Sequence, residues 1–403
     1  DNRRFQDDDW SFLTSGLRNF GRETNHGMEG YWKDTPVTYE LSELSSSVFA
    51  SLGLPDVADS LGLGSSPDGR ECILLVDGLG KNAIDNFGSR FPHLHSLRYE
   101  RTLKATFPST TATSLTSLGT GKRAGEHGMV GYTMRVPHSG VPERLLNALK
   151  WDERIDPQIW QPHKTLFERG VEAGIHVSHV SGKRYENTGF TRAALRGGTY
   201  RGANSLSELV SETSEALKKD RSFVYLYLND VDEASHGDGF GSDKFLAAMA
   251  KVDSLIGSLT SALPKGSRLW VSADHGMINR GEYVVLGKDN DLLDDVELLG
   301  GEPRSRYLYV TEDQIPKVQS QWRDFFGDKV DIYTRDEAIS FGFYGENVLD
   351  SVRERIGDLI VIAKGDLILV EPDREALQVA MVGHHGGRTK EETEIPLLQL
   401  LRD

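Results

Sequence analysis

Short uninterrupted runs of apolar residues recur along the chain, and three of them are followed directly by acidic residues. Residues 72–76, 223–228 and 268–273 have the length of a strand, and such continuous runs are typical of strands buried on both faces. Segments with helical apolar spacing, residues 205–219 and 242–263, lie between these runs. Because strand and helix alternate, we expect an α/β fold with a mainly parallel central sheet.

Changes in this pattern predict the domain boundaries. Residues 1–35 show no clean periodicity, and a Ser/Leu-rich stretch with helical spacing over 41–63 runs into a turn-forming cluster at 64–69. Beyond residue 281 the strand candidates become short and are interrupted by Gly and acidic residues; they are 307–310, 330–333, 359–362 and 367–370. We therefore expect an N-terminal arm and helical strap over 1–69 and an α/β catalytic core over 70–280 plus 383–403. Residues 281–382 would be partly an inserted cap and partly core.

Composition excludes several classes of protein. The 403 residues carry 46 Lys+Arg against 61 Asp+Glu, and this net charge of −15 disfavours stable nucleic-acid binding. No apolar window reaches the ~18 residues of a membrane span. The first 30 residues lack the order of a signal peptide, which favours a cytoplasmic location, although the chain begins at Asp1 and the compartment stays open. The single cysteine, Cys72, excludes a Cys-rich zinc site, so any metal must be held by His and carboxylate ligands.

Acidic and imidazole side chains gather where the expected strands end, and ligands of open α/β sheets bind at this edge. The candidates are Asp77, Asp232, His236, Asp274, His275 and His385. A catalytic zinc ion takes about three N/O ligands and keeps one position open, so about six such residues suit two zinc ions that share a substrate. Asp232 and His236 lie four residues apart and would share one side of a helical turn.

Each candidate has a simpler explanation when it is taken alone. Asp77 precedes a glycine after a strand and fits a helix N-cap. Asp232 fits a solvated surface position, and Asp230 or Glu233 could serve as the ligand in its place. His384 and His385 stand side by side between glycines, so one of them would not bind metal. The joint occurrence of these residues in this order is what predicts a metal site.

A candidate nucleophile lies in the Ser/Thr-rich segment 107–121. Residues 112–118 have helix-like apolar spacing, which places Thr111 at a helix start. Backbone N–H groups there favour an alkoxide and a phosphate, and binding to a metal would lower the pKa of the hydroxyl further. Taken alone, the segment is better explained by a capping threonine.

Five ordered motifs resemble the alkaline phosphatase superfamily, and within it the nucleotide pyrophosphatase/phosphodiesterase branch, with phosphonoacetate hydrolase a near relative. They span roughly residues 70–400 and are Asp77, the segment 108–121 followed by His127-Gly128, Asp232-x-x-x-His236, Asp274-His275-Gly276 and His385-Gly386-Gly387. In that family the nucleophilic Ser or Thr lies nine residues before the Thr of a Thr-Gly pair, and counting back from Thr120 gives Thr111. The resemblance implies a three-layer α/β sandwich with an inserted cap and two zinc ions. One ion would be held by Asp77, Thr111, Asp274 and His275, and the other by Asp232, His236 and His385.

Two positions depart from the family pattern. Diesterase relatives carry an Asn just after the His-Gly-x-x-Gly turn, where it donates to a phosphate oxygen, and Tyr132 stands at that place here. Tyr132 is therefore our candidate substrate-binding residue, since a phenol also donates one hydrogen bond. Ala112 replaces an aromatic residue that in many relatives helps to form the nucleobase slot. The preference for nucleotides is therefore open.

These features together predict a metal-dependent hydrolase of phosphodiester or pyrophosphate bonds that works through a threonyl-phosphate intermediate. Its cofactors would be two divalent ions, zinc or alternatively manganese. The alternatives are a phosphonoacetate hydrolase or phosphomonoesterase of the same superfamily and, less favoured, a catalytically silent member that binds phosphate-bearing ligands. The expected partner is a small phosphodiester or nucleotide substrate, and a homodimer stays open as the oligomeric state.

Overall fold

The computed structural model describes residues 39–66, 68–141, 143–371 and 378–402. The irregular arm expected over residues 1–35 lies outside these ranges, as do residues 372–377 of the region with short strands.

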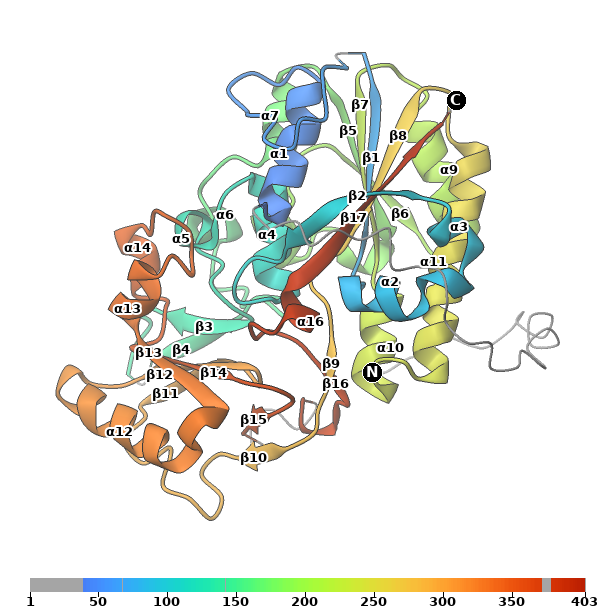
Figure 1. Cartoon of the computed structure of the whole chain (residues 1–403). Helices are drawn as coiled ribbons and strands as arrows, with labels where there is room; N and C mark the ends of the chain where they lie inside the picture. The colour runs from blue at the N-terminus through green and yellow to red at the C-terminus, as the bar shows by residue number, and fades with distance from the viewer. Residues whose placement is uncertain (1–38, 67, 142, 372–377, 403) are drawn as a thin grey trace, which may run out of the picture. The chain divides into compact units, whose positions relative to one another are not determined.

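A seven-stranded sheet forms the centre of the described fold, with strand order β2-β17-β8-β1-β7-β5-β6 (Figure 1). Its members are β1 (Arg70–Val76), β2 (Arg98–Lys104), β5 (His176–Gly182), β6 (Thr199–Ala203), β7 (Ser222–Leu228), β8 (Ser267–Ser272) and β17 (Glu394–Leu401). The five strands from β8 to β6 run parallel, whereas β17 runs antiparallel between β8 and β2. The prediction of an α/β fold with a mainly parallel sheet is confirmed.

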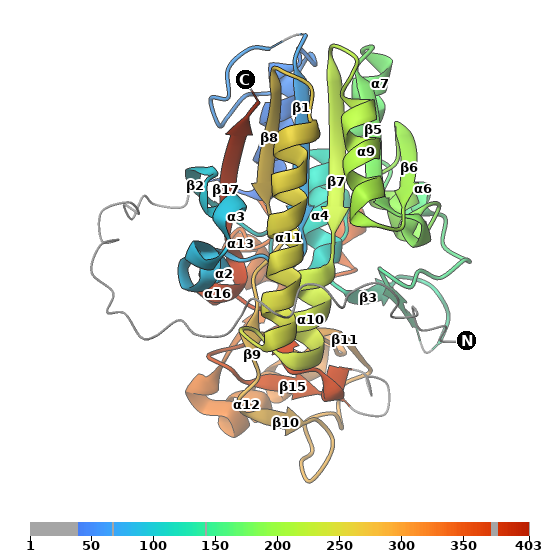
Figure 2. The ribbon, with the colours of Figure 1, turned by 90° about the vertical axis from the view of Figure 1, so that its right-hand side faces the viewer.

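Helices cover both faces of this sheet, which gives three layers. α9 (Leu206–Ala216) and α11 (Asp243–Ala262) lie on one face, and α1 (Leu41–Ser51), α4 (Thr111–Thr120) and α7 (Leu166–Glu172) lie on the other (Figures 1 and 2). β1, β7 and β8 are buried almost throughout, because helices pack on them from both sides. This double burial explains their continuous apolar sequences.

The helix predicted over residues 41–63 is wrong beyond its first half. α1 ends at Ser51, and Gly53 then adopts a left-handed φ of +77°. Pro55 follows, and a left-handed glycine with a proline just after it ends a helix. Leu61 is nevertheless buried, so the apolar spacing in this stretch reflects burial and not helix.

A second sheet follows β8 in the sequence. It is antiparallel and four-stranded, with strand order β11-β12-β14-β13, and its members are β11 (Leu298–Glu302), β12 (Ser305–Tyr309), β13 (Val330–Thr334) and β14 (Leu359–Ala363). α12 (Ile315–Phe326) packs Val318 and Trp322 against Leu308 and Val361 of this sheet. The second sheet therefore has a hydrophobic cluster of its own.

The described chain also contains shorter elements. The strands are β3 (Thr133–Val136), β4 (Arg144–Asn147), β9 (Ile278–Asn279), β10 (Tyr283–Val285), β15 (Ile368–Val370) and β16 (Gly383–His384). The helices include α2 (Lys81–Phe87), α3 (Pro92–His95), α5 (Ala124–His127), α6 (Pro157–Trp160), α8 (Gly189–Ala194), α10 (Asp230–Asp238), α13 (Arg335–Ser340), α14 (Asp350–Arg353) and α16 (Lys390–Thr393). β3 pairs with β4, β10 with β15, and β9 with β16. Among the helices that the structure describes, none combines the length and apolar character that a membrane span needs.

Candidate active site

The predicted ligands follow strands that are neighbours in the central sheet. Asp77 comes directly after β1, and Asp274 and His275 follow β8. Asp232 lies in the first turn of α10, which begins just after β7. Because β8, β1 and β7 are adjacent and parallel, their carboxyl ends place these side chains at one edge of the sheet. His385 reaches the same edge from the end of β16.

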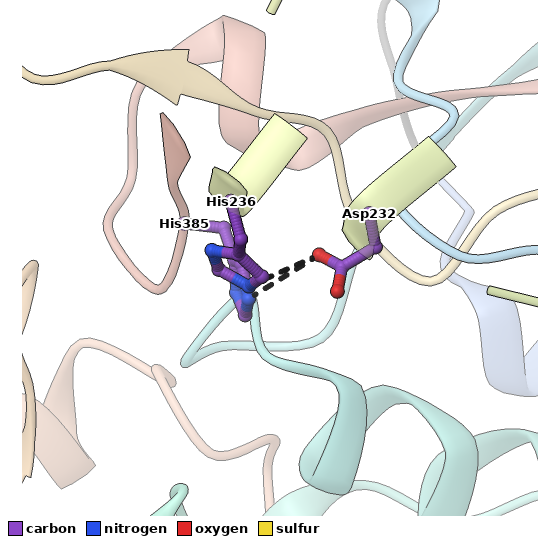
Figure 3. A group of neighbouring side chains, drawn as sticks. All are labelled: Asp232, His236 and His385. Atoms are coloured by element: carbon purple, nitrogen blue, oxygen red, sulfur yellow. Dashed lines mark ion pairs between the residues drawn. The ribbon is translucent and has the colours of Figure 1, made fainter. Parts of the chain in front are cut away.

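One group of ligand atoms comprises Asp232, His236 and His385, which lie within 4.8 Å of one another (Figure 3). The Nε2 atoms of His236 and His385 lie 3.2 Å and 3.8 Å from Oδ1 of Asp232. Each imidazole donates its Nδ1–H to a backbone carbonyl, His236 to Gly383 at 2.8 Å and His385 to Ser109 at 2.9 Å. Both Nε2 atoms are therefore left to face the carboxylate, which is the orientation that metal-binding histidines adopt.

A second group lies next to the first and shares Asp232 with it. Asp77, Asp232 and His275 offer ligand atoms within 4.8 Å of one another. Oγ1 of Thr111 lies 3.2 Å from Nε2 of His275 and 3.5 Å from Oδ2 of Asp77. The structure thus brings the predicted nucleophile to the predicted ligands.

Asp274 lies beside this second group without belonging to it. Its Oδ1 accepts hydrogen bonds from the backbone N–H groups of Gly78 and His275, at 3.2 Å and 3.1 Å. Its Oδ2 lies 3.5 Å from Nε2 of His275. A Cβ at Gly78 would lie 3.0 Å from Cα of Asp232, so glycine after Asp77 allows the two segments to meet.

The carboxylates of the site carry lone pairs that no described donor satisfies. Oδ1 of Asp77, Oδ1 of Asp232 and Oδ2 of Asp274 are buried without a hydrogen-bond partner among the described residues. Burial and the nearby Asp77 raise the pKa of Asp232 and of Asp274 well above the usual range. Burial lowers the pKa of His275, but the surrounding carboxylates outweigh it and raise that pKa to about 10. Burial and mutual repulsion therefore disfavour the ionised forms of these carboxylates, and a bound cation would stabilise them.

Thr111 is the first residue of α4, after an extended Thr110. The positive end of a helix dipole and free backbone N–H groups are found at such a position, and they favour an anion. The segment before the helix is tied to the His385 loop, because the hydroxyl of Ser109 donates to the carbonyl of Gly387 at 2.8 Å. This hydrogen bond joins the segment that precedes Thr111 to the segment that carries His385.

Two residues of the site were missed by sequence reasoning. The hydroxyl of Tyr227 donates to Oδ2 of Asp77 at 2.5 Å. Glu302, from β11 of the second sheet, is buried and places Oε2 3.8 Å from Nδ1 of His385. Tyr227 could have been found from its place near the end of a predicted strand, whereas nothing near Glu302 in the sequence points to the site. Tyr132 is half-buried just before β3, and its role in substrate binding stays a prediction.

Comparisons with known proteins agree with this arrangement. The model of the family described as type I phosphodiesterase / nucleotide pyrophosphatase matches residues 72–388. Ectonucleotide pyrophosphatase/phosphodiesterase family member 1 is 24% identical over 248 residues in mouse and 23% in rat. These matches cover 57% of this chain and 26% of each relative, so the chain spans about a quarter of the length of the curated relatives it matches.

Solved structures share the fold. Murine ectonucleotide pyrophosphatase/phosphodiesterase 5 has a TM-score of 0.65 at 17% identity, with 82% of this chain and 87% of that chain covered. A structure of the same murine protein as an inactive threonine-to-alanine variant, in complex with AMP, has a TM-score of 0.64 at 17% identity and the same coverage. At this identity the likeness establishes the fold alone.

Proposed function

The chain belongs to the type I phosphodiesterase/nucleotide pyrophosphatase family, and from this premise we propose that it hydrolyses phosphodiester or pyrophosphate bonds with Thr111 as the nucleophile. The observation that carries the proposal is the position of Thr111 at the start of α4, 3.2 Å from His275 and beside two ligand groups that share Asp232. The AMP complex of the inactive murine variant supports a nucleotide as one substrate class.

The residues present fit two divalent cations. In tetrahedral zinc sites with bonds of about 2.0–2.2 Å, ligand atoms lie about 3.3 Å apart. The 3.2 Å between Nε2 of His236 and Oδ1 of Asp232, two atoms without a proton between them, matches that spacing. One ion would be held by Asp77, Thr111, Asp274 and His275, and the other by Asp232, His236 and His385. Such ions supply positive charge against phosphoryl oxygens and favour the ionised form of a nearby hydroxyl, and manganese suits the same ligands as zinc.

The side chains of the protein then perform a double displacement. Oγ1 of Thr111 loses its proton and forms a bond to phosphorus, while the bond from phosphorus to the leaving oxygen breaks and that oxygen gains a proton. Water next attacks the phosphorus of the threonyl phosphate, the bond to Oγ1 breaks, and Thr111 regains its proton. The first backbone N–H groups of α4 face the phosphoryl oxygens in both steps, because the nucleophile is the first residue of that helix.

Replacement of Thr111 by alanine tests the proposal, with bis(p-nitrophenyl) phosphate as the substrate. We expect kcat to fall by at least about 10³-fold, because the attacking atom is removed, while Thr111→Ser keeps measurable turnover. Thr113→Ala is the matched control, since Thr113 is buried on the same helix and its hydroxyl has no partner among the described residues. Activity of Thr111→Ala within tenfold of the parent would contradict the nucleophile assignment.

The substrate class and the cap are separate parts of the proposal. Initial rates on a diester, a monoester and phosphonoacetate at equal metal loading separate the diesterase from the alternatives within the superfamily.

The cap is assigned to the region 281–382, and the separate hydrophobic cluster of the second sheet supports an inserted unit there. Glu302 of this unit reaches His385, which supports assigning part of the region to the catalytic core.

A further inference from the structure

A cavity of about 200 Å³ lies beside Thr111, between the central sheet and the helices α4 and α8. Leu115 of α4 and Phe190 of α8 line one wall, and residues of β5, β6 and β7 line the other. Asp77, Asp232 and Thr111 line the same cavity, so it begins at the candidate nucleophile. A substrate group that occupies this cavity would therefore be an ester group on the reacting phosphorus.

The sheet wall of the cavity carries a row of three aromatic side chains from adjacent strands. His179 of β5 is the register partner of Tyr200 of β6 and of Tyr225 of β7. The ring centroids of His179 and Tyr225 lie 5.7 Å apart, and those of His179 and Tyr200 lie 6.1 Å apart. His179 and Tyr225 are 3% and 2% exposed, so neither side chain is open to bulk solvent.

Two polar atoms of this row have no hydrogen-bond partner among the residues that the structure describes. They are Nε2 of His179 and the hydroxyl of Tyr225. The ring of His179 donates to the backbone carbonyl of Gly197, which leaves Nε2 as an acceptor, and burial lowers the pKa of His179 to about 4. A buried polar group without a hydrogen-bond partner is destabilising, so a pair of them in a cavity beside the nucleophile indicates a ligand.

The lining limits the chemistry of that ligand. Among the described lining residues the charged ones are Asp77 and Asp232, both at the catalytic end, so the cavity offers no cation to an anionic group. A cavity of ~150 Å³ holds a benzene molecule, so this one accepts a single ring and not a long acyl chain. A hydroxyl group can donate to Nε2 of His179 and accept from Tyr225 at the same time.

We infer that the cavity binds a neutral, ring-sized alcohol, a sugar or cyclitol ring, as one ester group of the phosphodiester, recognised by His179 and Tyr225. The inference rests on the proposed function and deepens it by naming the substrate class. Leu149 and Thr188 also line a neighbouring groove, and Leu149 is 42% exposed, so this end of the cavity lies near the surface.

A matched pair of diesters tests the inference: inositol ethyl phosphate and cyclohexyl ethyl phosphate, followed by phosphorus NMR on the metal-loaded full chain. The rings match in size, and only the first carries hydroxyl groups. We expect kcat/KM for the inositol ester to exceed that for the cyclohexyl ester by at least about 100-fold, because the analogue leaves buried polar groups unpaired. His179→Phe and Tyr225→Phe should each reduce this ratio at least about tenfold by lowering turnover of the inositol ester alone.

A thermal measurement checks the same atoms without turnover. Tyr225→Phe removes an unpartnered hydroxyl, so we expect its Tm in the absence of substrate to equal or exceed that of the parent. Tyr309→Phe is the matched control, since Tyr309 is buried and its hydroxyl donates to the carbonyl of Arg355 at 2.6 Å. That variant should lower the Tm.

These outcomes distinguish failure of the ring-binding inference from failure of the proposed hydrolase function. Equal turnover of the two esters, or variants that slow both esters alike, would overturn the inference while cleavage of bis(p-nitrophenyl) phosphate still supports the proposed function. A lowered Tm for Tyr225→Phe would also overturn it, because the hydroxyl would then have a structural partner. No cleavage of any diester by the parent would overturn both.

Discussion

Replacing Arg304 by methionine tests a buried ion pair that fixes the loop after His385. Arg304 lies between β11 and β12, and its Nη2 and Nε atoms donate to Oε2 and Oε1 of Glu392, at 2.9 Å and 3.0 Å. Both side chains are 0% exposed. Oε1 of Glu392 also accepts the backbone N–H of Gly387 at 2.9 Å. The ion pair therefore connects the second sheet to the segment that presents a candidate metal ligand.

The expected decrease in the free energy of unfolding of Arg304→Met follows from the burial of the ion pair. Loss of one partner of a fully buried pair leaves an uncompensated charge and costs about 3–5 kcal/mol. Glu392→Gln keeps an acceptor for Gly387 without the charge, so the double variant should be less destabilised than the sum of the two single changes. Lys364→Met is the matched control, because Lys364 and Asp331 form an ion pair at side-chain exposures of 47% and 42%. An exposed pair of this kind contributes at most about 1 kcal/mol.

Urea unfolding, followed by tryptophan fluorescence, measures these free energies. Zinc affinity, measured by competition with a chromophoric chelator, should fall in Arg304→Met, since the His385 loop loses its anchor. A loss of unfolding free energy in Arg304→Met no larger than that in Lys364→Met would contradict a stabilising ion pair. Additive effects of Arg304→Met and Glu392→Gln would contradict it as well.

The remaining predictions concern pH and metal. Burial lowers the pKa of His127 to about 3, so its contribution to stability is complete above the unfolded pKa of about 6.5 and is lost as the pH falls toward 3. Between pH 6 and 4 the unfolding free energy of the parent should therefore fall by about 1.4 kcal/mol per pH unit more steeply than that of His127→Gln, and parallel urea curves would contradict this. Asp232→Asn should be neutral or stabilising in chelator-treated protein, because burial and repulsion from Asp77 both disfavour an ionised carboxylate at this position. With zinc at 100 times its Kd the parent should gain about 2.7 kcal/mol and the variant much less, and an equal gain in thermal shift would argue against Asp232 as a ligand.

The fold was predictable where strands are buried on both faces of the sheet. β1, β7 and β8 are buried on both faces, so their sequences are apolar throughout and reveal the parallel core. β2 and β6 lie at the two edges of the sheet, and β5 contributes His179 and Ser181 to the cavity. These strands therefore mix polar and apolar residues, and the apolar pattern did not single them out.

The site was predictable where a few consecutive residues carry it. Asp274 and His275 are adjacent in the sequence, and Asp232 and His236 share a helical turn, so spacing alone placed each pair together. Glu302 reaches the site through the packing of a separate sheet, which no local pattern encodes. The composition of the two candidate ligand groups likewise depends on tertiary contacts, because the second group contains Asp232, whereas the family resemblance implies Asp274 there.

The position of Asp232 follows from the order of the strands. β7 is the neighbour of β1, and the backbone N–H of Asp232 donates to the carbonyl of Asp77 at 3.1 Å. This contact holds the first turn of α10 against the end of β1, where Gly78 leaves room for it. One carboxylate is thereby shared by both candidate ligand groups. Asp232 also lines the cavity beside Thr111, so the same contact places this carboxylate at the catalytic end of the cavity that we propose for the substrate ring.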